Sequence, residues 1–233
     1  MRMGRREAWE GRIRVAGQHV QAPRRKPRGL GHERYDEILT AAKELFIAEG
    51  FATVTTRKLA KRVGLSQTGL YVYFKNKEEI LDALCQRTFS RLGERLRQVA
   101  ADAPPSLALF RRLVEGYIEF GIENPGEYML TFMVAGSGAK APREQDLSLL
   151  LEDQGPGMQA FLLFREQLAR LGDAGLLKPL DPTLATQVVH MAMHGVVALL
   201  IARPHFGWSS RHLLVDTLVD TLLSGLARSN SAS

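Results

Sequence analysis

The residues with the most distinctive chemistry lie between Thr55 and Lys77. Two threonines open this stretch, a glycine stands near its middle, and a Ser-Gln-Thr run precedes a group of tyrosines and lysines. Proteins use hydroxyl, amide and ammonium groups to bond the base edges and phosphate oxygens of duplex DNA. Their order along the stretch therefore predicts a surface that contacts DNA.

Two short helices are predicted to position these groups. Thr55 or Thr56 can cap the first helix, because a threonine hydroxyl accepts a hydrogen bond from a free amide of the first turn. Gly64 then allows a sharp turn, since glycine takes a positive φ without steric cost. Ser66 can cap the second helix, and two short helices joined by such a turn form a helix-turn-helix. The inward-facing apolar side chains are predicted to be Leu59, Ala60, Val63, Leu70 and Phe74.

The second helix is predicted to read the DNA sequence. Gln67 and Thr68 lie at its start, the part of a recognition helix that reaches base edges in the major groove. Glutamine can bond adenine through two hydrogen bonds, and a threonine methyl can contact thymine. Tyrosine hydroxyls, an ammonium group and helix N-terminal amides can hold phosphates. The residues predicted to contact DNA are Thr55, Thr56, Arg57, Ser66, Gln67, Thr68, Gly69, Tyr71, Tyr73 and Lys77.

Each of these residues taken alone has a simpler interpretation. Tyr71 and Tyr73 can be packing residues, and the lysines can form a solvated helix face. The ordered set of caps, turn and polar outer face favours DNA binding over that interpretation.

The rest of the chain is predicted to be helical, giving an all-α fold of about nine helices. Strand-like alternation is absent, and apolar residues recur every three or four positions. Residues 32–76 are expected to form a three-helix DNA-binding domain, and residues 77–228 an effector-binding and dimerisation bundle. The further helices are predicted over residues 32–50, from 77 to the prolines at 104 and 105, and over 106–123, 125–135, 156–172, 182–203 and 209–227.

The N-terminal arm carries most of the positive charge. The chain has 233 residues and a formal net charge of +6, and residues 1–31 hold nine basic side chains against two acidic ones. We expect this arm, and the tail 229–233, to be disordered, because they have too few apolar residues to bury. The arm either grips DNA phosphates or the minor groove, or is a solvated extension. Its composition also resembles an organelle transit peptide.

Composition favours a cytoplasmic protein without a membrane partner. The hydrophobic fraction of 45% is ordinary for a globular protein, and the single cysteine, Cys85, fits a reducing compartment. No continuous apolar core of a secretory signal is visible. The apolar stretch 188–202 is shorter than the roughly 20 residues of a membrane span and contains two histidines, so we interpret it as a buried helix.

Residues 33–79 resemble the N-terminal domain of tetracycline-repressor-type (TetR) regulators. The resemblance lies in Ala48-Glu49-Gly50-Phe51, Thr55-Thr56, Val63-Gly64-Leu65-Ser66 and the run from Gly69 to Glu79. It implies a homodimer on a palindromic operator, with recognition helices in successive major grooves and a variable effector-binding domain. Downstream, Met193-His194-Gly195 resembles a C-terminal subgroup known for a Trp-His-Gly motif, with methionine in place of tryptophan.

The C-terminal bundle is predicted to hold an effector and to form the dimer. Met and aromatic residues at helical spacing are more often plain core, but methionines also adapt to apolar ligands, which favours a lipophilic effector. Candidate pocket residues are Phe89, Tyr117, Phe120, Tyr128, Met129, Phe132, Met133, Phe161 and His190. Candidate dimer-interface residues are Met191, His194, Gly195, Leu214, Leu218 and Leu222. His190 and His194 have metal-ligand spacing but no third ligand nearby, so neither a metal site nor a cofactor is predicted.

The function predicted from the sequence is a ligand-responsive, sequence-specific regulator, acting as a repressor that its effector releases from DNA. The helix that starts at Lys77 is expected to link the two domains. An enzyme is not predicted, because phosphate-binding glycine loops, nucleophile elbows and zinc-binding helix motifs are missing. A non-specific architectural DNA-binding protein that uses the basic arm is the alternative, and an activator stays possible.

Overall fold

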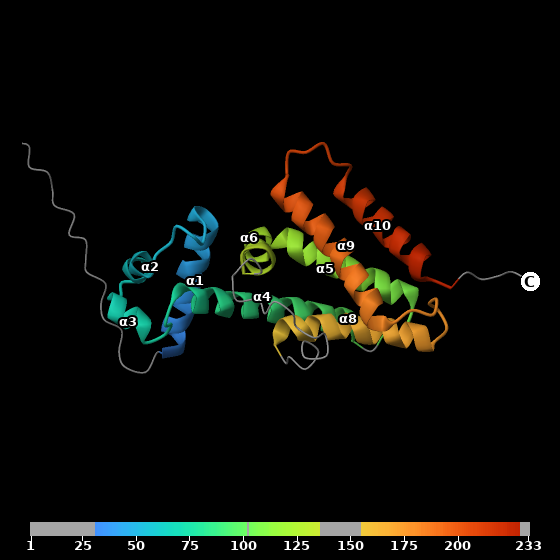
Figure 1. Cartoon of the computed structure of the whole chain (residues 1–233), viewed down its shortest axis with the longest axis horizontal. Helices are drawn as coiled ribbons and strands as arrows, with labels where there is room; N and C mark the ends of the chain where they lie inside the picture. Colours follow the sequence, from blue (N-terminus) through green and yellow to red (C-terminus); the bar gives the residue numbers. More distant parts are fainter. Residues whose placement is uncertain (1–30, 102, 136–154, 229–233) are drawn as a thin grey trace, which may run out of the picture.

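The computed structural model describes residues 31–101, 103–135 and 155–228, and within them the chain is all-α (Figure 1). The molecule is elongated, with the helices of residues 31–71 at one end and those of residues 107–226 toward the other. The described part contains no strand, only an isolated bridge between Leu177 and Ala227. The predicted fold class is therefore confirmed.

The helix bounds follow the predicted ones closely. Side-chain caps fix several starts: the oxygens of Thr55 and Ser66 each accept a hydrogen bond from an amide of the first turn, as predicted, and those of Asn76, Ser106 and Asp181 do the same for α4, α5 and α9. The helices are α1 (Gly31–Glu49), α2 (Thr56–Arg62), α3 (Gln67–Tyr71), α4 (Lys77–Ala100), α5 (Leu107–Glu123), α6 (Pro125–Tyr128), the π-helix η1 (Met129–Val134), α8 (Pro156–Asp173), α9 (Pro182–Ala202) and α10 (Arg211–Leu226).

The segment after α6 departs from the prediction. A single α-helix over 125–135 is wrong beyond Tyr128, because the chain continues as the π-helix η1. The wider π turn lets neighbouring side chains reach different surroundings. Leu130 is buried against α1 and α4, whereas the ring of Phe132 stacks on that of Tyr128 at 4.4 Å on the other side. Such π-helical turns are frequent at functional sites.

Two hydrophobic cores divide the molecule. The first joins α1, α2 and α3 to the start of α4, and the second joins the rest of α4 to α5, α8, α9 and α10. Helix α4 spans both, with Ile80 and Leu84 in the first core and Leu92 and Leu96 in the second. The first core therefore continues past residue 76, where the sequence predicted the domain boundary, as far as Cys85.

Helix α9 is covered on one side and open on the other. Its length and composition alone would suffice to cross a membrane, but Val189, Met193 and Val197 are buried in the second core. Within the single chain, the interpretation of residues 188–202 as a buried helix therefore applies to one side of α9. The opposite side exposes Leu184, Val188, Met191 and Leu199.

Candidate nucleic-acid interface and ligand cavity

The helix-turn-helix is held by two caps and a tight turn. Thr55 Oγ1 accepts a hydrogen bond from the Lys58 amide at 3.2 Å, and Ser66 Oγ accepts one from the Gly69 amide at 3.0 Å. Gly64 adopts a φ of 66°, as the turn requires. A Cβ on Gly69 would lie 3.2 Å from Ser66 Oγ, so glycine leaves room for the cap. These contacts fix α3 against the first core through Leu70, which is fully buried.

The exposed face of α2 and α3 carries a three-residue polar cluster. The amide nitrogen of Gln67 donates to the Tyr71 hydroxyl at 3.0 Å and to Thr56 Oγ1 at 3.3 Å. Thr56 Oγ1 and the Tyr71 hydroxyl are 3.5 Å apart. The hydrogen bonds from Thr56 and then Gln67 lower the pKa of Tyr71. The cluster orients the Gln67 side chain on the surface, where base edges or phosphates can replace its present partners.

Five other predicted DNA contacts lie on or beside this face. Thr55, Arg57, Ser66 and Thr68 are exposed, and Gly69 is half-buried at the α3 cap. Arg57 and Thr68 lie near the starts of α2 and α3, where the first amides have no partner within the helix. The structure thus brings the N-termini of both helices and the polar cluster to one surface. Their contacts with DNA remain predictions.

Lys77 and Tyr73 point elsewhere. The Lys77 ammonium donates to the backbone oxygens of Phe51, Ala52 and Val54 at 2.9, 3.2 and 3.3 Å, and lies 4.5 Å from the Phe51 ring centroid. These three contacts match its three donors, so a phosphate bond would require the ammonium to leave one carbonyl. Tyr73 is half-buried against the first core. For Tyr73 the structure gives the packing role that was its simpler interpretation, and for Lys77 it gives a structural role that the sequence pattern did not predict.

A separate cavity of about 190 Å³ lies inside the second core. Helices α4, α5, α8 and α9 and the π-helix η1 contribute its walls. Five of the nine predicted pocket residues line it: Phe89, Tyr117, Phe132, Phe161 and His190. The sequence analysis missed the other lining residues, which are Leu92, Leu96, Gly157, Met158, Ala160, Phe164, Thr186 and Met193. Met193 and Thr186 are three or four positions from His190, a spacing that could have identified them.

The other four predicted pocket residues do not line this cavity. Phe120 is buried on another side of α5, where the Arg91 guanidinium lies 5.6 Å from its ring centroid. Tyr128 stands behind Phe132, with which it stacks. Met129 is partly exposed, and Met133 is 38% exposed. The change from α6 to the π-helix redirects Met129 and Met133, so an α-helical period placed these two residues wrongly.

A hydrogen-bonded chain runs from the cavity wall to α9. The hydroxyls of Tyr117 and Tyr128 are 3.1 Å apart, and the Tyr128 hydroxyl is 2.8 Å from His194 Nδ1. Burial raises the pKa of both tyrosines, so the hydroxyls stay protonated. Burial also lowers the pKa of His194, and burial followed by the neighbouring His194 lowers that of His190. Both imidazoles are therefore neutral near pH 7, and the described residues contain no cluster of three metal ligands.

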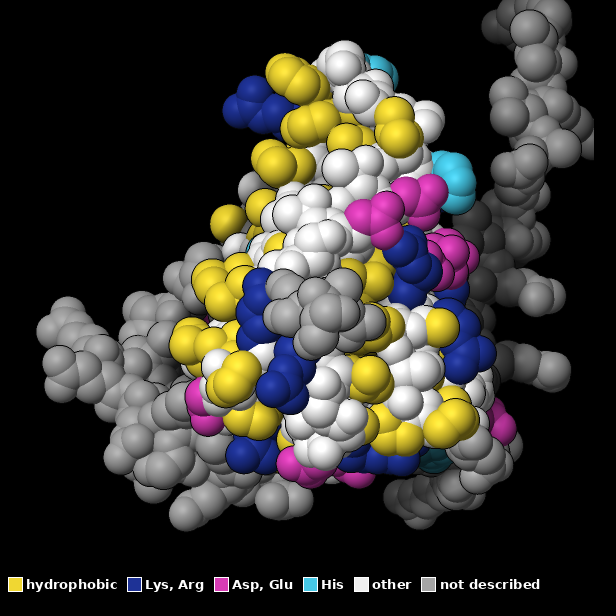
Figure 2. Space-filling model, turned by 90° about the vertical axis from the view of Figure 1, so that its right-hand side faces the viewer, with side chains coloured by type: hydrophobic (Ala, Val, Ile, Leu, Met, Phe, Trp, Pro, Cys, Tyr) yellow, Lys and Arg dark blue, Asp and Glu magenta, His cyan; other side chains and the backbone are white. Residues whose placement is uncertain are grey.

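The predicted dimer-interface residues fall into two groups. Met191 is 63% exposed and Gly195 faces open space, so both lie on the open side of α9. His194 is partly buried and bonds inward to Tyr128, and Leu214 and Leu218 are half-buried. The prediction for Leu222 is wrong, because its side chain is buried in the second core of its own chain. Figure 2 shows the end of the bundle farthest from α2 and α3, where hydrophobic side chains reach the surface in several patches with Lys and Arg between them.

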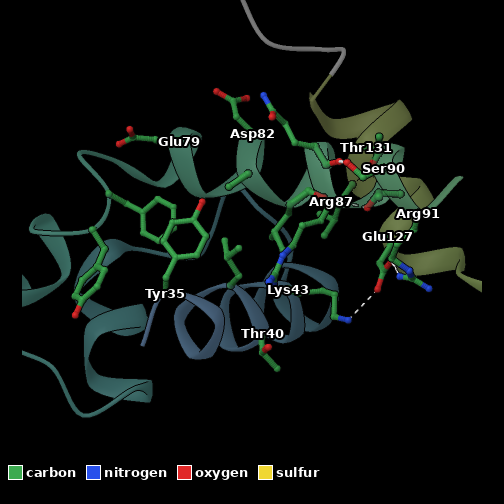
Figure 3. A pocket seen from close by; sticks show the side chains of 18 residues that line it. Tyr35, Thr40, Lys43, Glu79, Asp82, Arg87, Ser90, Arg91, Glu127 and Thr131 are labelled. Carbon is green, nitrogen blue, oxygen red and sulfur yellow. Dashed lines mark hydrogen bonds and ion pairs between the residues drawn. The ribbon is translucent and has the colours of Figure 1, made fainter. Parts of the chain in front are cut away.

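The two units meet where α6 touches α1 and α4. Glu127 accepts a hydrogen bond from Lys43 of α1 at 2.8 Å and pairs with Arg91 of α4, which also donates to the Asn124 side-chain oxygen at 2.9 Å. A Cβ on Gly126 would lie 2.5 Å from the end of the Ile47 side chain, so α6 packs directly on α1. Figure 3 shows Lys43, Arg91 and Glu127 at one side of an open, charged groove of about 840 Å³ between α1 and α4.

The arrangement defines a two-part, helix-turn-helix DNA-binding transcriptional regulator. Its N-terminal residues 38–84 match the family described as "Bacterial regulatory proteins, tetR family", and residues 110–225 match "Tetracyclin repressor-like, C-terminal domain". The chain belongs to the TetR family of bacterial regulatory proteins. The resemblance found in residues 33–79 is thereby confirmed, whereas the Trp-His-Gly subgroup stays a prediction.

Similar proteins agree with this assignment. The nucleoid occlusion factor SlmA of Aliivibrio fischeri strain MJ11 is 31% identical over 159 residues, which cover 67% of this chain and 78% of the relative. A Rhodococcus sp. RHA1 protein of unknown function has a similar structure, with a TM-score of 0.69, 22% identity, and coverage of 87% and 100% of the two chains. The structure of the SmeT–triclosan complex matches with a TM-score of 0.61, 21% identity, and coverage of 85% and 93%.

Proposed function

We propose that this protein is a homodimeric transcriptional repressor in the cytoplasm that binds a palindromic operator and leaves it when a small lipophilic effector binds. The observation that carries the proposal is the pairing of an exposed, capped α3 bearing Gln67 with an apolar cavity in the second core. The function requires no catalytic residue. The SmeT–triclosan complex supports it to the extent that a protein with this fold holds a small lipophilic molecule.

The recognition step rests on the start of α3. Gln67 and Thr68 are exposed there, at the part of the helix that enters a major groove in this motif. The Gln67 amide is already oriented by Thr56 and Tyr71. Exchanging these surface hydrogen bonds for bonds to adenine costs little, because the number of hydrogen bonds is conserved. Each good pair of hydrogen bonds to a base discriminates by about 1–3 kcal/mol.

Dimerisation would cover the open side of α9. Leu184 and Val188, followed by Met191 and Leu199, form an apolar stripe there, and contiguous apolar surface on a helix favours a protein partner. Gly195 lies within the stripe with no neighbour within 4 Å, so it permits close approach of a second helix. Two copies would present two α3 helices, which lets two weak half-sites act together.

Two elements would couple the cavity to DNA binding. Helix α4 contributes to both cores, as expected from the sequence. The segment from Gly126 to Phe132 is the second element: Gly126 and Glu127 contact α1, and Phe132 lines the cavity. An effector that prefers one packing of Phe132 would shift the population of α1 positions and so the spacing of the two α3 helices. An effector with equal affinity for free and DNA-bound protein would contradict this mechanism.

Binding to many nucleoid sites is a second candidate function. The observation that favours it is the similarity to SlmA, whose name describes a nucleoid occlusion factor. This candidate is related to the architectural alternative that rests on the basic arm. That arm lies outside the described residues. A nucleoid-wide role would require affinity for many genomic sites, whereas a repressor occupies few.

The decisive experiment is selection of bound sequences from a random duplex DNA pool by the purified full chain at near-physiological salt. Recovery of one palindromic motif, with half-sites about one helical turn apart, is the expected result. A variant with Gln67→Ala serves as the matched control, and its pool should lose preference at one position of each half-site. Recovery of no motif, with binding that disappears as salt rises, would contradict the repressor proposal.

A further inference from the structure

Among the described residues, none with a charged side chain lines the cavity in the second core. Its walls are hydrophobic and aromatic, except for the hydroxyls of Tyr117 and Thr186 and the imidazole of His190. Thr186 donates its hydrogen to the Pro182 carbonyl at 2.7 Å, and the Tyr117 hydroxyl is paired with that of Tyr128 at 3.1 Å. The ring nitrogens of His190 make no hydrogen bond to another described residue, and they are not fully enclosed by protein. His190 is therefore the polar group that a ligand would meet.

The electrostatics of this cavity exclude an ionic ligand. Burial lowers the pKa of His190, which leaves the imidazole neutral near pH 7. A carboxylate or an ammonium group would be buried here without a counter-charge, which is strongly unfavourable. A neutral imidazole instead offers one donor and one acceptor. A hydroxyl group satisfies either one, whichever nitrogen carries the proton.

The size and shape of the walls limit the apolar part of a ligand. The cavity measures about 190 Å³, and an apolar protein cavity of about 150 Å³ holds one benzene molecule. One six-membered ring with one or two further heavy atoms therefore fits. Aromatic rings contribute five of the lining side chains, those of Phe89, Tyr117, Phe132, Phe161 and Phe164. Rings of this kind favour an aromatic guest through edge-to-face contacts.

We propose that the effector is an uncharged, single-ring aromatic compound of the phenol class whose hydroxyl group bonds to His190. This inference rests on the proposed function, because it names the ligand class of the cavity that the function requires. The apolar ring would lie against Phe132, and its arrival would alter the packing of the segment that also contacts α1.

Calorimetric titration of the full chain, without DNA, tests the ligand class directly. The reference probe is p-cresol. Toluene lacks its hydroxyl group, benzoate carries a negative charge, and 1-naphthol has a second ring. We expect p-cresol to bind about fivefold more tightly than toluene, since one hydrogen bond contributes about 1 kcal/mol. Benzoate should bind more weakly than p-cresol because its charge would be buried without a counter-charge, and 1-naphthol because its second ring exceeds the volume of the cavity. Equal or tighter binding of benzoate, toluene or 1-naphthol would overturn the proposal.

A variant pair tests the role of His190. His190→Phe should lower the affinity for p-cresol about fivefold and leave that for toluene unchanged, because the ring is kept and the hydrogen bond is lost. His205→Phe, at an exposed position between α9 and α10, is the matched control and should change neither affinity. An unchanged affinity for p-cresol in a folded His190→Phe variant would overturn the assignment. If that variant does not fold, the comparison of p-cresol with toluene on the wild-type chain still tests whether the hydroxyl group of the ligand contributes to binding.

The two proposals can fail separately. Absence of p-cresol binding in a protein that selects a palindromic operator would overturn the ligand class and leave the repressor function standing. Selective p-cresol binding in a protein that selects no operator would support the ligand class and contradict the repressor function. Calorimetry without DNA makes this separation possible.

Discussion

The polar side chains that distinguish the two ends of this molecule lie on the surface at one end and inside the hydrophobic core at the other. At the α1–α3 end, the core is inside and the polar Thr56, Gln67 and Tyr71 side chains lie on the surface. At the other end the distinctive groups, Tyr117 and His190, face an internal cavity. The first arrangement suits a large polar partner such as DNA, whereas the second suits a small apolar one. In the proposed function, this difference separates DNA recognition from effector binding within a single chain.

The largest effect is expected from truncation inside the first core. Leu70→Ala should lower the free energy of unfolding by about 2–5 kcal/mol, because Leu70 is fully buried and its removal leaves a cavity. Since the two cores are distinct, this variant should lose DNA binding at a lower denaturant concentration than p-cresol binding. Chemical denaturation together with both binding assays checks this. Val72→Ala, at a position that is 80% exposed, is the control and should change stability by less than about 0.5 kcal/mol. Parallel loss of both activities in Leu70→Ala would contradict separate cores.

Removal of the reading side chain should affect specificity but not sensing. Gln67→Ala should reduce discrimination between the preferred base and others by about 1–3 kcal/mol, or roughly 5- to 150-fold. The affinity for p-cresol should stay unchanged, since Gln67 does not line the cavity. Competition assays with operators mutated at single positions measure the discrimination. An unchanged preference at every position would show that Gln67 does not read a base.

Close packing in the second core provides the next test. A Cβ on Gly121 would lie 2.5 Å from Val197 and 3.0 Å from the Tyr128 ring, so Gly121→Ala forces α5, α9 and Tyr128 apart. We expect a loss of about 1–3 kcal/mol in the free energy of unfolding and weaker p-cresol binding. Gly93→Ala is the matched control, because its Cβ would meet only the flexible Arg97 side chain at 3.5 Å. Thermal unfolding of both variants measures this difference, and equal stability of Gly121→Ala and Gly93→Ala would contradict the packing argument.

The smallest of these effects concerns Lys77, where the structure and the sequence motif lead to different expectations. Lys77→Met keeps the apolar stem but leaves the carbonyls of Phe51, Ala52 and Val54 without the ammonium group. The geometry predicts a loss of about 1–2 kcal/mol in stability, with a salt dependence of DNA binding close to that of the wild type. The sequence motif instead predicts that the slope of log affinity against log salt falls by about one. Denaturation and salt titration together distinguish a structural lysine from a phosphate-binding one.

Sequence reasoning succeeded where neighbours in the chain determine the outcome. The caps at Thr55 and Ser66 and the turn at Gly64 were predictable, because each depends on residue types within four positions. The polar set on α3 followed for the same reason. The same approach missed the contacts of Lys77 with carbonyls more than 20 residues away. No local pattern encodes such a contact.

The cavity was harder to predict because packing of distant helices forms it. Five predicted residues line it, but Phe164 and Met158 of α8 were missed, since their side depends on how α8 packs against α4 and α9. The errors at Met129 and Met133 have a local cause. The π-helix changes the angle between successive side chains, and the sequence carries no signal for it that an α-helical period would reveal.

The most direct test of the central claim, that the α3 end reads a DNA sequence, is the ratio of affinities for the selected operator and a scrambled duplex, measured with the full chain at near-physiological salt. We predict a ratio of about a thousandfold or more, as for specific DNA-binding proteins in general. The ratio should persist when salt is raised, although both affinities fall. A ratio near one, with both duplexes released together as salt rises, would contradict the claim and make the protein a non-specific DNA binder.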